Sequence, residues 1–224
     1  MNGDYGRFAD RRAAGRALAV AVKAAAPVDP VVLGLPRGGV PVAFEVARAL
    51  VAPLDILLVR KIGAPGHEEY GIGALVDGAS PQVVIDEGAA RLVGADQAYI
   101  DREVTRQLAE IERRRAIYRT GAPQPLAGRT VIVVDDGIAT GGTVRAALKA
   151  LARVDAARVV LAVPLAPAEV LPDLRPLCDE VICLMVPEPF RAVGMHYADF
   201  TQTTDAEVID LLAKATEWAG QGSP

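Results

Sequence analysis

Residues 131–143 read Val-Ile-Val-Val-Asp-Asp-Gly-Ile-Ala-Thr-Gly-Gly-Thr, and this stretch decides the fold. Its four β-branched residues predict a fully buried strand that ends at Val134. Asp135 and Asp136 leave the end of that strand together. A helical pattern begins at Thr143, so the loop of small residues lies at the start of a helix. The stretch therefore predicts a strand, an acidic pair, a small-residue loop and a helix in direct succession.

The rest of the chain alternates between helical and extended patterns. Helical spacing of apolar residues predicts helices over residues 10–26, 39–51, 96–119, 143–154, 167–174 and 205–218. Apolar runs predict strands over 31–35, 54–59, 130–134, 158–163 and 180–186, with short strands at 75–76 and 83–85 around a turn at Asp77-Gly78. Glycine, proline and polar residues at 63–71 predict an exposed, mobile loop, and 121–128 is a connector. This order implies an α/β fold with a mostly parallel, twisted sheet flanked by helices, in which ligands bind beyond the carboxyl ends of the strands.

Composition excludes several classes of protein. The chain has 224 residues, enough for one domain with a sizeable core. Its 24 Lys and Arg against 28 Asp and Glu give a net charge of −4, which argues against non-specific binding to nucleic acid. No apolar run is long enough to span a membrane, and residues 1–7 lack the order of a signal peptide. Cys178 and Cys183 are too few for a disulfide framework or a structural zinc site, so we expect two reduced thiols in a cytoplasmic protein.

The loop after Val134 has the chemistry of an oxyanion site. A helix start offers free backbone N–H groups and a positive dipole end. The glycines let the backbone approach an oxyanion closely, and the threonine hydroxyls add further hydrogen-bond donors. The two carboxylates would suit ribose hydroxyls or a divalent cation. A Walker loop is excluded because Thr143 stands where lysine is needed, and the glycine spacing does not fit a dinucleotide fingerprint. A simple N-capped turn does not explain the adjacent aspartates.

Residues 131–143 closely resemble the phosphoribosyl pyrophosphate (PRPP) signature of type I phosphoribosyltransferases, with a departure at Gly137, where that family usually has an aliphatic residue. The resemblance covers about 31–200 in the order of elements and extends to bacterial phosphoribosyltransferase-domain proteins of about this length, a group that leaves the acceptor open. It implies one domain over 1–224, with a core at about 31–186 and a small hood built from the N-terminal helix and about 187–218. By the same resemblance, Asp135 and Asp136 hold the ribose. The residues that would hold the 5-phosphate are Ala139, Thr140, Gly141, Gly142 and Thr143.

Two further loops resemble family elements. Arg37, Gly38 and Gly39 follow a predicted strand and resemble the pyrophosphate loop, where an arginine can chelate diphosphate oxygens in a bidentate way. Arg60-Lys61 resembles the start of the flexible closing loop of orotate phosphoribosyltransferases, which would neutralise the leaving diphosphate. His67 matches that loop in kind, although an ordinary exposed histidine is an equal alternative.

Residues 187–200 resemble the hood segment of purine phosphoribosyltransferases. There the resemblance implies acceptor contacts from Phe190, Arg191 and Tyr197, with Phe190 as the stacking ring. The alternative is that these aromatic residues close the end of the sheet. The stretch 161–165 contains no lysine to recognise a 6-oxo group, which argues against a 6-oxopurine.

The resemblance implies an enzyme of nucleotide metabolism, a pentosyltransferase that displaces pyrophosphate from PRPP with a nitrogenous acceptor such as a nucleobase or related amine. It also implies Mg²⁺ as cofactor, held directly or indirectly near Asp135 and Asp136. Homodimers are common in the family. The alternative function is a PRPP-sensing regulator that binds nucleic acid, for which Arg113-Arg114-Arg115 on helix 96–119 is the residue-level support. We favour a solvated helix face with i,i+4 ion pairs for these arginines.

Overall fold

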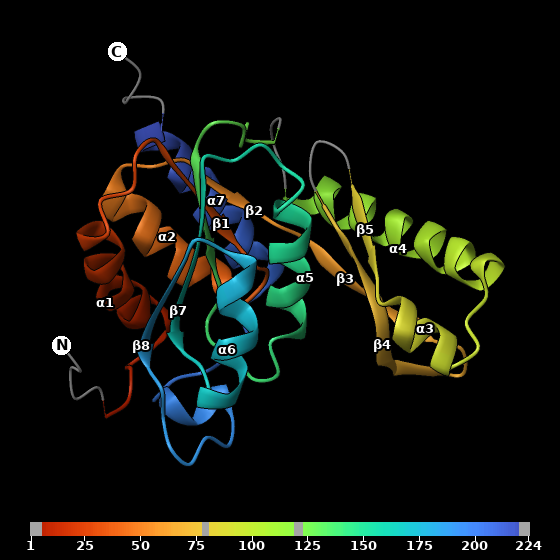
Figure 1. Ribbon diagram of the computed structural model, residues 1–224. Helices are drawn as coiled ribbons and strands as arrows, with labels where there is room; N and C mark the ends of the chain where they lie inside the picture. Colours follow the sequence, from red (N-terminus) through yellow and green to blue (C-terminus); the bar gives the residue numbers. More distant parts are fainter. Residues whose placement is uncertain (1–5, 78–80, 119–122, 220–224) are drawn as a thin grey trace.

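A five-stranded parallel sheet forms the centre of the molecule (Figure 1). The computed structural model describes residues 6–77, 81–118 and 123–219. In spatial order the strands are β2 (Leu54–Ile56), β1 (Pro30–Gly34), β6 (Thr130–Val134), β7 (Arg158–Leu165) and β8 (Glu180–Met185). Strand β6 pairs with both β1 and β7, so that Val134 lies opposite Gly34 and Ala162. The expected α/β class with a mostly parallel sheet is confirmed.

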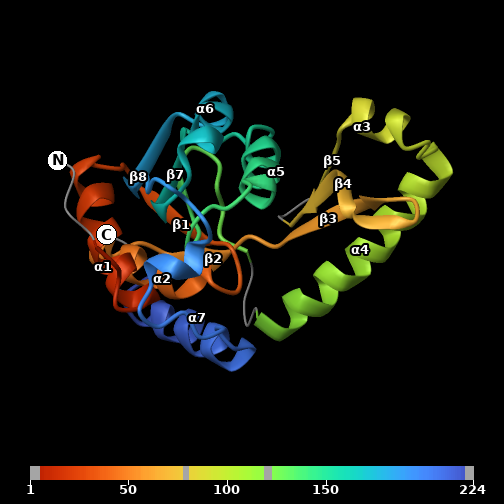
Figure 2. The same ribbon diagram turned by 90° about the horizontal axis from the view of Figure 1, so that it is seen from below.

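Helices cover both faces of this sheet (Figures 1 and 2). One face carries α1 (Arg11–Ala24), α2 (Gly39–Leu50) and α7 (Asp205–Ala219), and the other carries α5 (Gly142–Leu151) and α6 (Leu171–Leu174). Because successive strand residues point to opposite faces, Ile132 and Val134 enter the first core while Val131 and Val133 enter the second. Burial of each of these side chains contributes about 1.5–3 kcal/mol. Strand β6 is apolar at every buried position of 131–134 because both of its faces are covered by helices.

A second, antiparallel sheet forms a separate lobe (Figure 2). It contains β3 (Val59–Ala64), β4 (His67–Val76) and β5 (Gln82–Ile85), and is accompanied by α3 (Glu87–Leu92) and α4 (Gln97–Tyr118). Ile62, Ile72 and Ile100 form its small core. The predicted strand at 54–59 is therefore divided, because β2 ends at Ile56 and the chain enters the second sheet at Val59.

The prediction that 63–71 is a loop is wrong, although Gly66, His67 and Tyr70 are exposed as expected. Ala64 pairs with His67, so Pro65-Gly66 is a two-residue turn between two strands. Proline presets the backbone of the first turn position, and Gly66 supplies the positive φ of 72° at the second. Glycine and proline here build a hairpin rather than an open loop.

Most other predicted elements lie close to their expected bounds, but the strand predicted at 75–76 extends over all of β4, and helix α3 was not predicted. The short helix at 167–174 is a 3₁₀ turn (Ala168–Val170) followed by α6, and further 3₁₀ turns occur at Arg175–Leu177 and Val193–His196. Some residues of the predicted segments lie outside the described part of the chain. These are Gly78, Arg119 and residues 1–5, 121 and 122. In the part of the chain that the structure describes, no helix is long and apolar enough to cross a membrane.

The segment before α1 lies beside the segment after β8. The backbone N–H of Phe8 donates to the carbonyl of His196 at 2.9 Å, and that of Ala198 donates to the carbonyl of Phe8 at 2.8 Å. Both segments contribute to an apolar cluster at the carboxyl end of the sheet. In contrast, α7 packs on α2, where the rings of Phe44 and Trp218 lie 5.1 Å apart. The assignment of a hood to the N-terminal helix and about 187–218 stays a prediction. Within these segments, α1 and α7 contribute residues to the core on one face of the sheet.

Candidate active site

An acidic pair lies at the carboxyl end of the central strand β6. Asp135 Oδ1 accepts a hydrogen bond of 2.9 Å from the backbone N–H of Asp136. Burial raises the pKa of the Asp135 carboxyl well above its usual range, and the negative charge of Asp136 raises it further. Burial also raises the pKa of Asp136, against the opposing effect of Arg11. A polar ligand that donates hydrogen bonds to these carboxyls would offset the cost of their desolvation.

Two helix N-termini flank this pair. Gly38 is the N-cap residue of α2 and Gly141 that of α5, and no side chain caps either helix. Strands β1 and β6 are parallel neighbours, so the loops that follow them meet at one edge of the sheet. Uncapped helix starts offer unsatisfied N–H groups to an anion. At α2, however, the N–H of Gly39 donates to the carbonyl of Leu35 at 3.0 Å and that of Val40 to the carbonyl of Arg37 at 3.1 Å. The structure thus brings the predicted pyrophosphate loop, acidic pair and phosphate loop together.

Glycine is required where the pyrophosphate loop touches the acidic pair. A Cβ atom on Gly38 would lie 2.1 Å from Asp136 Oδ2, and one on Gly39 would lie 2.7 Å from the carbonyl oxygen of Val134. Both distances are too short for any side chain. The Gly38-Gly39 pair therefore lets the backbone of one predicted ligand loop lie directly on the other.

Gly137, the departure from the family pattern, lies under the hood segment. Its φ is 155°, and a Cβ atom there would lie 2.7 Å from Cγ1 of Val193. Val193 thus fills the space that a side chain at position 137 would take. The missing aliphatic side chain is supplied from a distant part of the chain.

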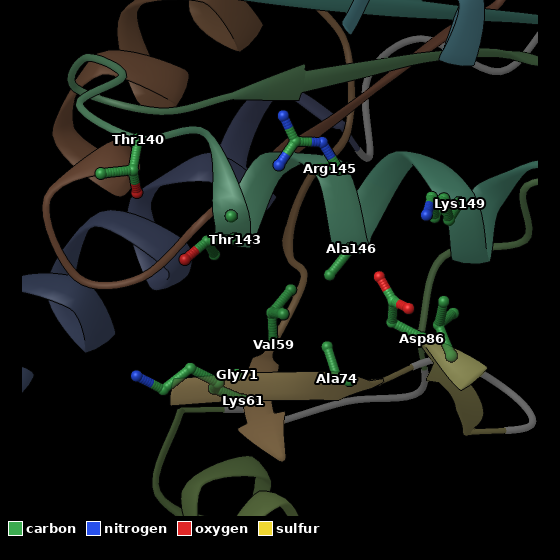
Figure 3. A pocket seen from close by; sticks show the side chains of 13 residues that line it. Val59, Lys61, Gly71, Ala74, Asp86, Thr140, Thr143, Arg145, Ala146 and Lys149 are labelled. Carbon is green, nitrogen blue, oxygen red and sulfur yellow. The ribbon is translucent and has the colours of Figure 1, made fainter. Parts of the chain in front are cut away.

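A cavity of about 360 Å³ opens between the start of α5 and the second sheet (Figure 3). Thr140 and Thr143 line it from the loop and α5, and Lys61 lines it from β3. The aliphatic stem of Lys61 lies over Gly71, where a Cβ atom would be 3.1 Å from Lys61 Cδ. Arg145 and Lys149 continue the positive lining along α5. The cavity is therefore lined by the predicted phosphate-binding hydroxyls and by Lys61, Arg145 and Lys149, together with the carboxylate of Asp86. Arg145 also pairs with Asp173 at 3.1 Å.

Arg60 lies on the other face of the same strand. Its Nε donates a hydrogen bond of 3.0 Å to Oε1 of Gln107 on α4. Neighbouring strand residues point to opposite faces, so Arg60 and Lys61 cannot serve one pocket in this arrangement. The structure brings Lys61 to the phosphate loop and holds Arg60 against α4. His67 is exposed at the turn of the β3–β4 hairpin.

Arg37 in the pyrophosphate loop points toward the start of α7. Its Nη1 lies 3.6 Å from Oδ1 of Asp205, and the hydroxyl of Tyr118 donates to the same oxygen at 2.5 Å. Burial and that hydrogen bond raise the pKa of Tyr118 to about 12. Sequence reasoning missed Asp205 and Tyr118, because they are far from Arg37 in the chain and belong to no motif.

The predicted acceptor residues do not share one environment. Tyr197 is only 1% exposed, and its hydroxyl donates to the carbonyl of Asp136 at 2.5 Å. Phe190 is partly buried and stacks on His196, with ring centroids 6.0 Å apart. Arg191 is exposed to solvent. Tyr197 thus links the hood to the acidic loop, while Phe190 is the ring with an accessible surface.

Sequence reasoning also missed Arg11, the first residue of α1. Its Nε lies 2.7 Å from Oδ2 of Asp136, and both side chains are largely buried. The residue stands at the start of an alanine-rich helix, and nothing in its local pattern distinguishes it from a surface arginine. Its role becomes visible only when the helix is placed against the sheet.

Four arginines of α4 form ion pairs, and one of the pairs, Arg114 with Glu110, has the predicted i,i+4 spacing. Arg106 lies 2.7 Å from Glu103, and Arg113 and Arg114 lie 2.8 and 2.9 Å from Glu110. Arg115 pairs with Asp77, which precedes β5. Arg106, Arg113, Arg114 and Arg115 are thus each paired with a carboxylate of this protein.

Comparison with known proteins agrees with the geometry. A family model described as "Phosphoribosyl transferase domain" matches residues 11–199. Two proteins of Mycobacterium tuberculosis, named "Putative phosphoribosyl transferase Rv0571c" and "Putative phosphoribosyl transferase MT0597", are each 46% identical over 209 residues. These matches cover 93% of this chain and 47% of each relative, so the chain spans about half their length. The crystal structure of TT1426 from Thermus thermophilus is 45% identical with a TM-score of 0.81, covering 96% of this chain and all of that one.

Proposed function

The chain belongs to the phosphoribosyl transferase domain family, and from this membership and the geometry of its site we propose that it transfers the 5-phosphoribosyl group of PRPP to a nitrogenous acceptor. In this reaction the bond between ribose C1 and the diphosphate oxygen breaks, and its electron pair leaves with pyrophosphate. A lone pair on the acceptor nitrogen forms the new bond to C1. The acceptor then loses a proton if it carried one.

The observation that supports this proposal most strongly is the acidic pair between two uncapped helix N-termini. The start of α5 suits the 5-phosphate, with N–H groups from 139–143 and the hydroxyls of Thr140 and Thr143. Asp135 and Asp136 suit the ribose hydroxyls, which can donate hydrogen bonds to carboxyl oxygens. The start of α2 suits the diphosphate. One elongated ligand with three chemically distinct parts accounts for all three features.

Negative charge grows on the diphosphate as it leaves, so catalysis should depend on cations and backbone donors placed around it. Arg37 and the N–H group at Gly38 are the groups that we assign to this role, because the N–H of Gly39 already donates to the carbonyl of Leu35 at 3.0 Å. Lys61 lines the cavity that Thr140 and Thr143 also line, whereas Arg60 is held on the opposite face of β3. We therefore assign Lys61 as the second cation that neutralises the diphosphate. We assign to Arg60 a structural role, because it binds Gln107 of α4 within the antiparallel lobe.

The acidic pair also fits Mg²⁺ as a cofactor. Protein sites for Mg²⁺ commonly use one or two carboxylates together with substrate phosphates and water, and Asp135 with Asp136 supplies that number. These residues would hold the ion directly or through water. When bound, the ion supplies positive charge to diphosphate oxygens.

The acceptor should bind near Phe190, which presents an aromatic ring beside the hood. Stacking on one such ring is worth about 1–3 kcal/mol for a nucleobase. Residues 161–165 of β7 include no lysine to recognise a 6-oxo group, so we expect a nucleobase or amine other than a 6-oxopurine.

The proposal is tested by PRPP-dependent release of pyrophosphate in the presence of Mg²⁺, screened over nucleobases and small amines. We expect at least one acceptor to support turnover. Asp135→Asn combined with Asp136→Asn should reduce that turnover at least about 100-fold, because the ribose loses its charged acceptors. The matched control is Asp210→Asn, an exposed aspartate on α7 that pairs with Lys214. Full activity in the double variant would refute the site assignment.

A further inference from the structure

Arg11 connects three parts of the candidate site. Its Nε lies 2.7 Å from Oδ2 of Asp136, and its Nη1 donates a hydrogen bond of 2.7 Å to the backbone carbonyl of Thr201. The guanidinium carbon lies over the ring of Phe200, 3.9 Å from the centroid. Helix α1, the segment after the hood and the acidic loop are therefore joined through one side chain.

These contacts fix the orientation of the guanidinium group. One nitrogen binds a carboxylate, another binds a carbonyl, and the group packs on an aromatic ring. Arginine suits this arrangement because its donors form a rigid planar fork, which lysine lacks. The side chains of Arg11 and Asp136 are 11% and 15% exposed, so water competes weakly for the pair.

The ion pair also packs on the pyrophosphate loop. A Cβ atom on Gly38 would lie 2.1 Å from Asp136 Oδ2 and 3.2 Å from Arg11 Nε. The carboxylate of Asp136 is therefore held between a fixed cation and the backbone of Gly38.

We propose that Arg11 is a positioning residue that orients Asp136 toward the ribose hydroxyls of the substrate. This inference rests on the proposed function and extends it. Arg11 sets the affinity of the site for phosphoribosyl compounds, while inorganic pyrophosphate binds through Arg37 and the start of α2 without its help. We therefore expect a selective loss of affinity. Removal of Arg11 should weaken the binding of ligands that carry ribose and leave the binding of pyrophosphate, which lacks ribose, nearly unchanged.

The test is calorimetric titration with three probes, PRPP, ribose 5-phosphate and inorganic pyrophosphate, each with Mg²⁺. We expect Arg11→Gln to raise the dissociation constants of PRPP and ribose 5-phosphate about tenfold or more, which corresponds to about 1.4 kcal/mol of binding free energy. Pyrophosphate should bind within about twofold of the wild-type protein, a change of less than about 0.5 kcal/mol. Arg11→Lys keeps the charge but not the fork, so it should show a smaller loss with the same selectivity.

The matched control is Arg16→Gln, since Arg16 lies on the same helix and approaches a carboxylate of Glu45 at 3.5 Å, with 55% of its side chain exposed. All three probes should bind this variant as they bind the wild-type protein. Equal loss of all three probes in both Arg11 variants would show a merely structural role and overturn the inference. Unchanged binding of PRPP to Arg11→Gln would overturn it as well. A wild-type protein that binds none of the probes would contradict the proposed function, and this inference with it.

Discussion

The hydroxyl of Tyr197 donates a hydrogen bond of 2.5 Å to the backbone carbonyl of Asp136. The ring of Tyr197 packs against those of Phe8 and Phe200, with centroids 5.6 and 5.0 Å away. The contact spans 61 positions in the chain and joins the segment after β8 to the loop after β6. The hood and the acidic pair therefore form one packed unit.

Tyr197→Phe should lower the free energy of unfolding by about 1–3 kcal/mol, because it leaves the Asp136 carbonyl without its buried donor and opens almost no space. Burial raises the pKa of Tyr197, so the hydroxyl remains a donor throughout the neutral range. Urea unfolding of the two proteins measures the effect. An unchanged midpoint and slope would show that the contact contributes nothing.

Gly137→Ala should destabilise the fold by about 1–3 kcal/mol, because the new Cβ atom meets Val193 at 2.7 Å and the positive φ disfavours a side chain. Val193→Ala in the same protein should restore part of this loss, since it removes the clash but not the backbone strain. A double-mutant cycle in urea gives the coupling between the two sites. Strict additivity would contradict the packing of Val193 on Gly137.

Asp205→Asn should strengthen pyrophosphate binding about two- to fivefold, since the ion pair that holds Arg37 toward α7 is worth up to about 1 kcal/mol. Arg37 then meets the diphosphate without competition from a carboxylate. Calorimetry with inorganic pyrophosphate measures the change, with Asp210→Asn on the same helix as the control. Weaker binding in Asp205→Asn would indicate instead that the aspartate positions Arg37 for its ligand.

Cys183 should react slowly with thiol reagents in the folded protein. Burial raises its pKa to about 11, so at pH 8 only about one molecule in a thousand carries the reactive thiolate. The rate of alkylation by iodoacetamide should rise about tenfold per pH unit between about pH 8 and 10, and should rise sharply on unfolding in urea. Rapid labelling at pH 8 without denaturant would contradict this burial.

The elements that could be predicted from sequence are those fixed by local pattern. Residues 130–143 specify β6, the acidic pair and the start of α5 through apolar β-branched residues, charges and glycines that are adjacent in the chain. The antiparallel lobe could not be found in the same way, because Gly71 and Gly73 lie inside β4 and glycine is depleted in strands. Position 73 requires glycine because of a tertiary contact, since a Cβ atom there would lie 2.5 Å from the carbonyl oxygen of Val84.

The same limit applies to the site. The loops at 37–39 and 139–143 were identified because each follows a strand and precedes a helix. Arg11 lies 125 positions from Asp136, and Asp205 is also remote in the chain from Arg37, so their contributions depend on how the helices pack. Arg60 and Lys61 show a related difficulty. Two adjacent cations suggest one shared function, but neighbouring residues of a strand point to opposite faces of the sheet.

The most direct test of the central claim is a crystal structure of the protein with PRPP and Mg²⁺. We expect the 5-phosphate on the backbone N–H groups of 139–143, the ribose hydroxyls within hydrogen-bond distance of Asp135 and Asp136, and the diphosphate at Arg37 and the start of α2. A ligand bound elsewhere, with the acidic pair contacting only protein groups, would contradict the proposed site.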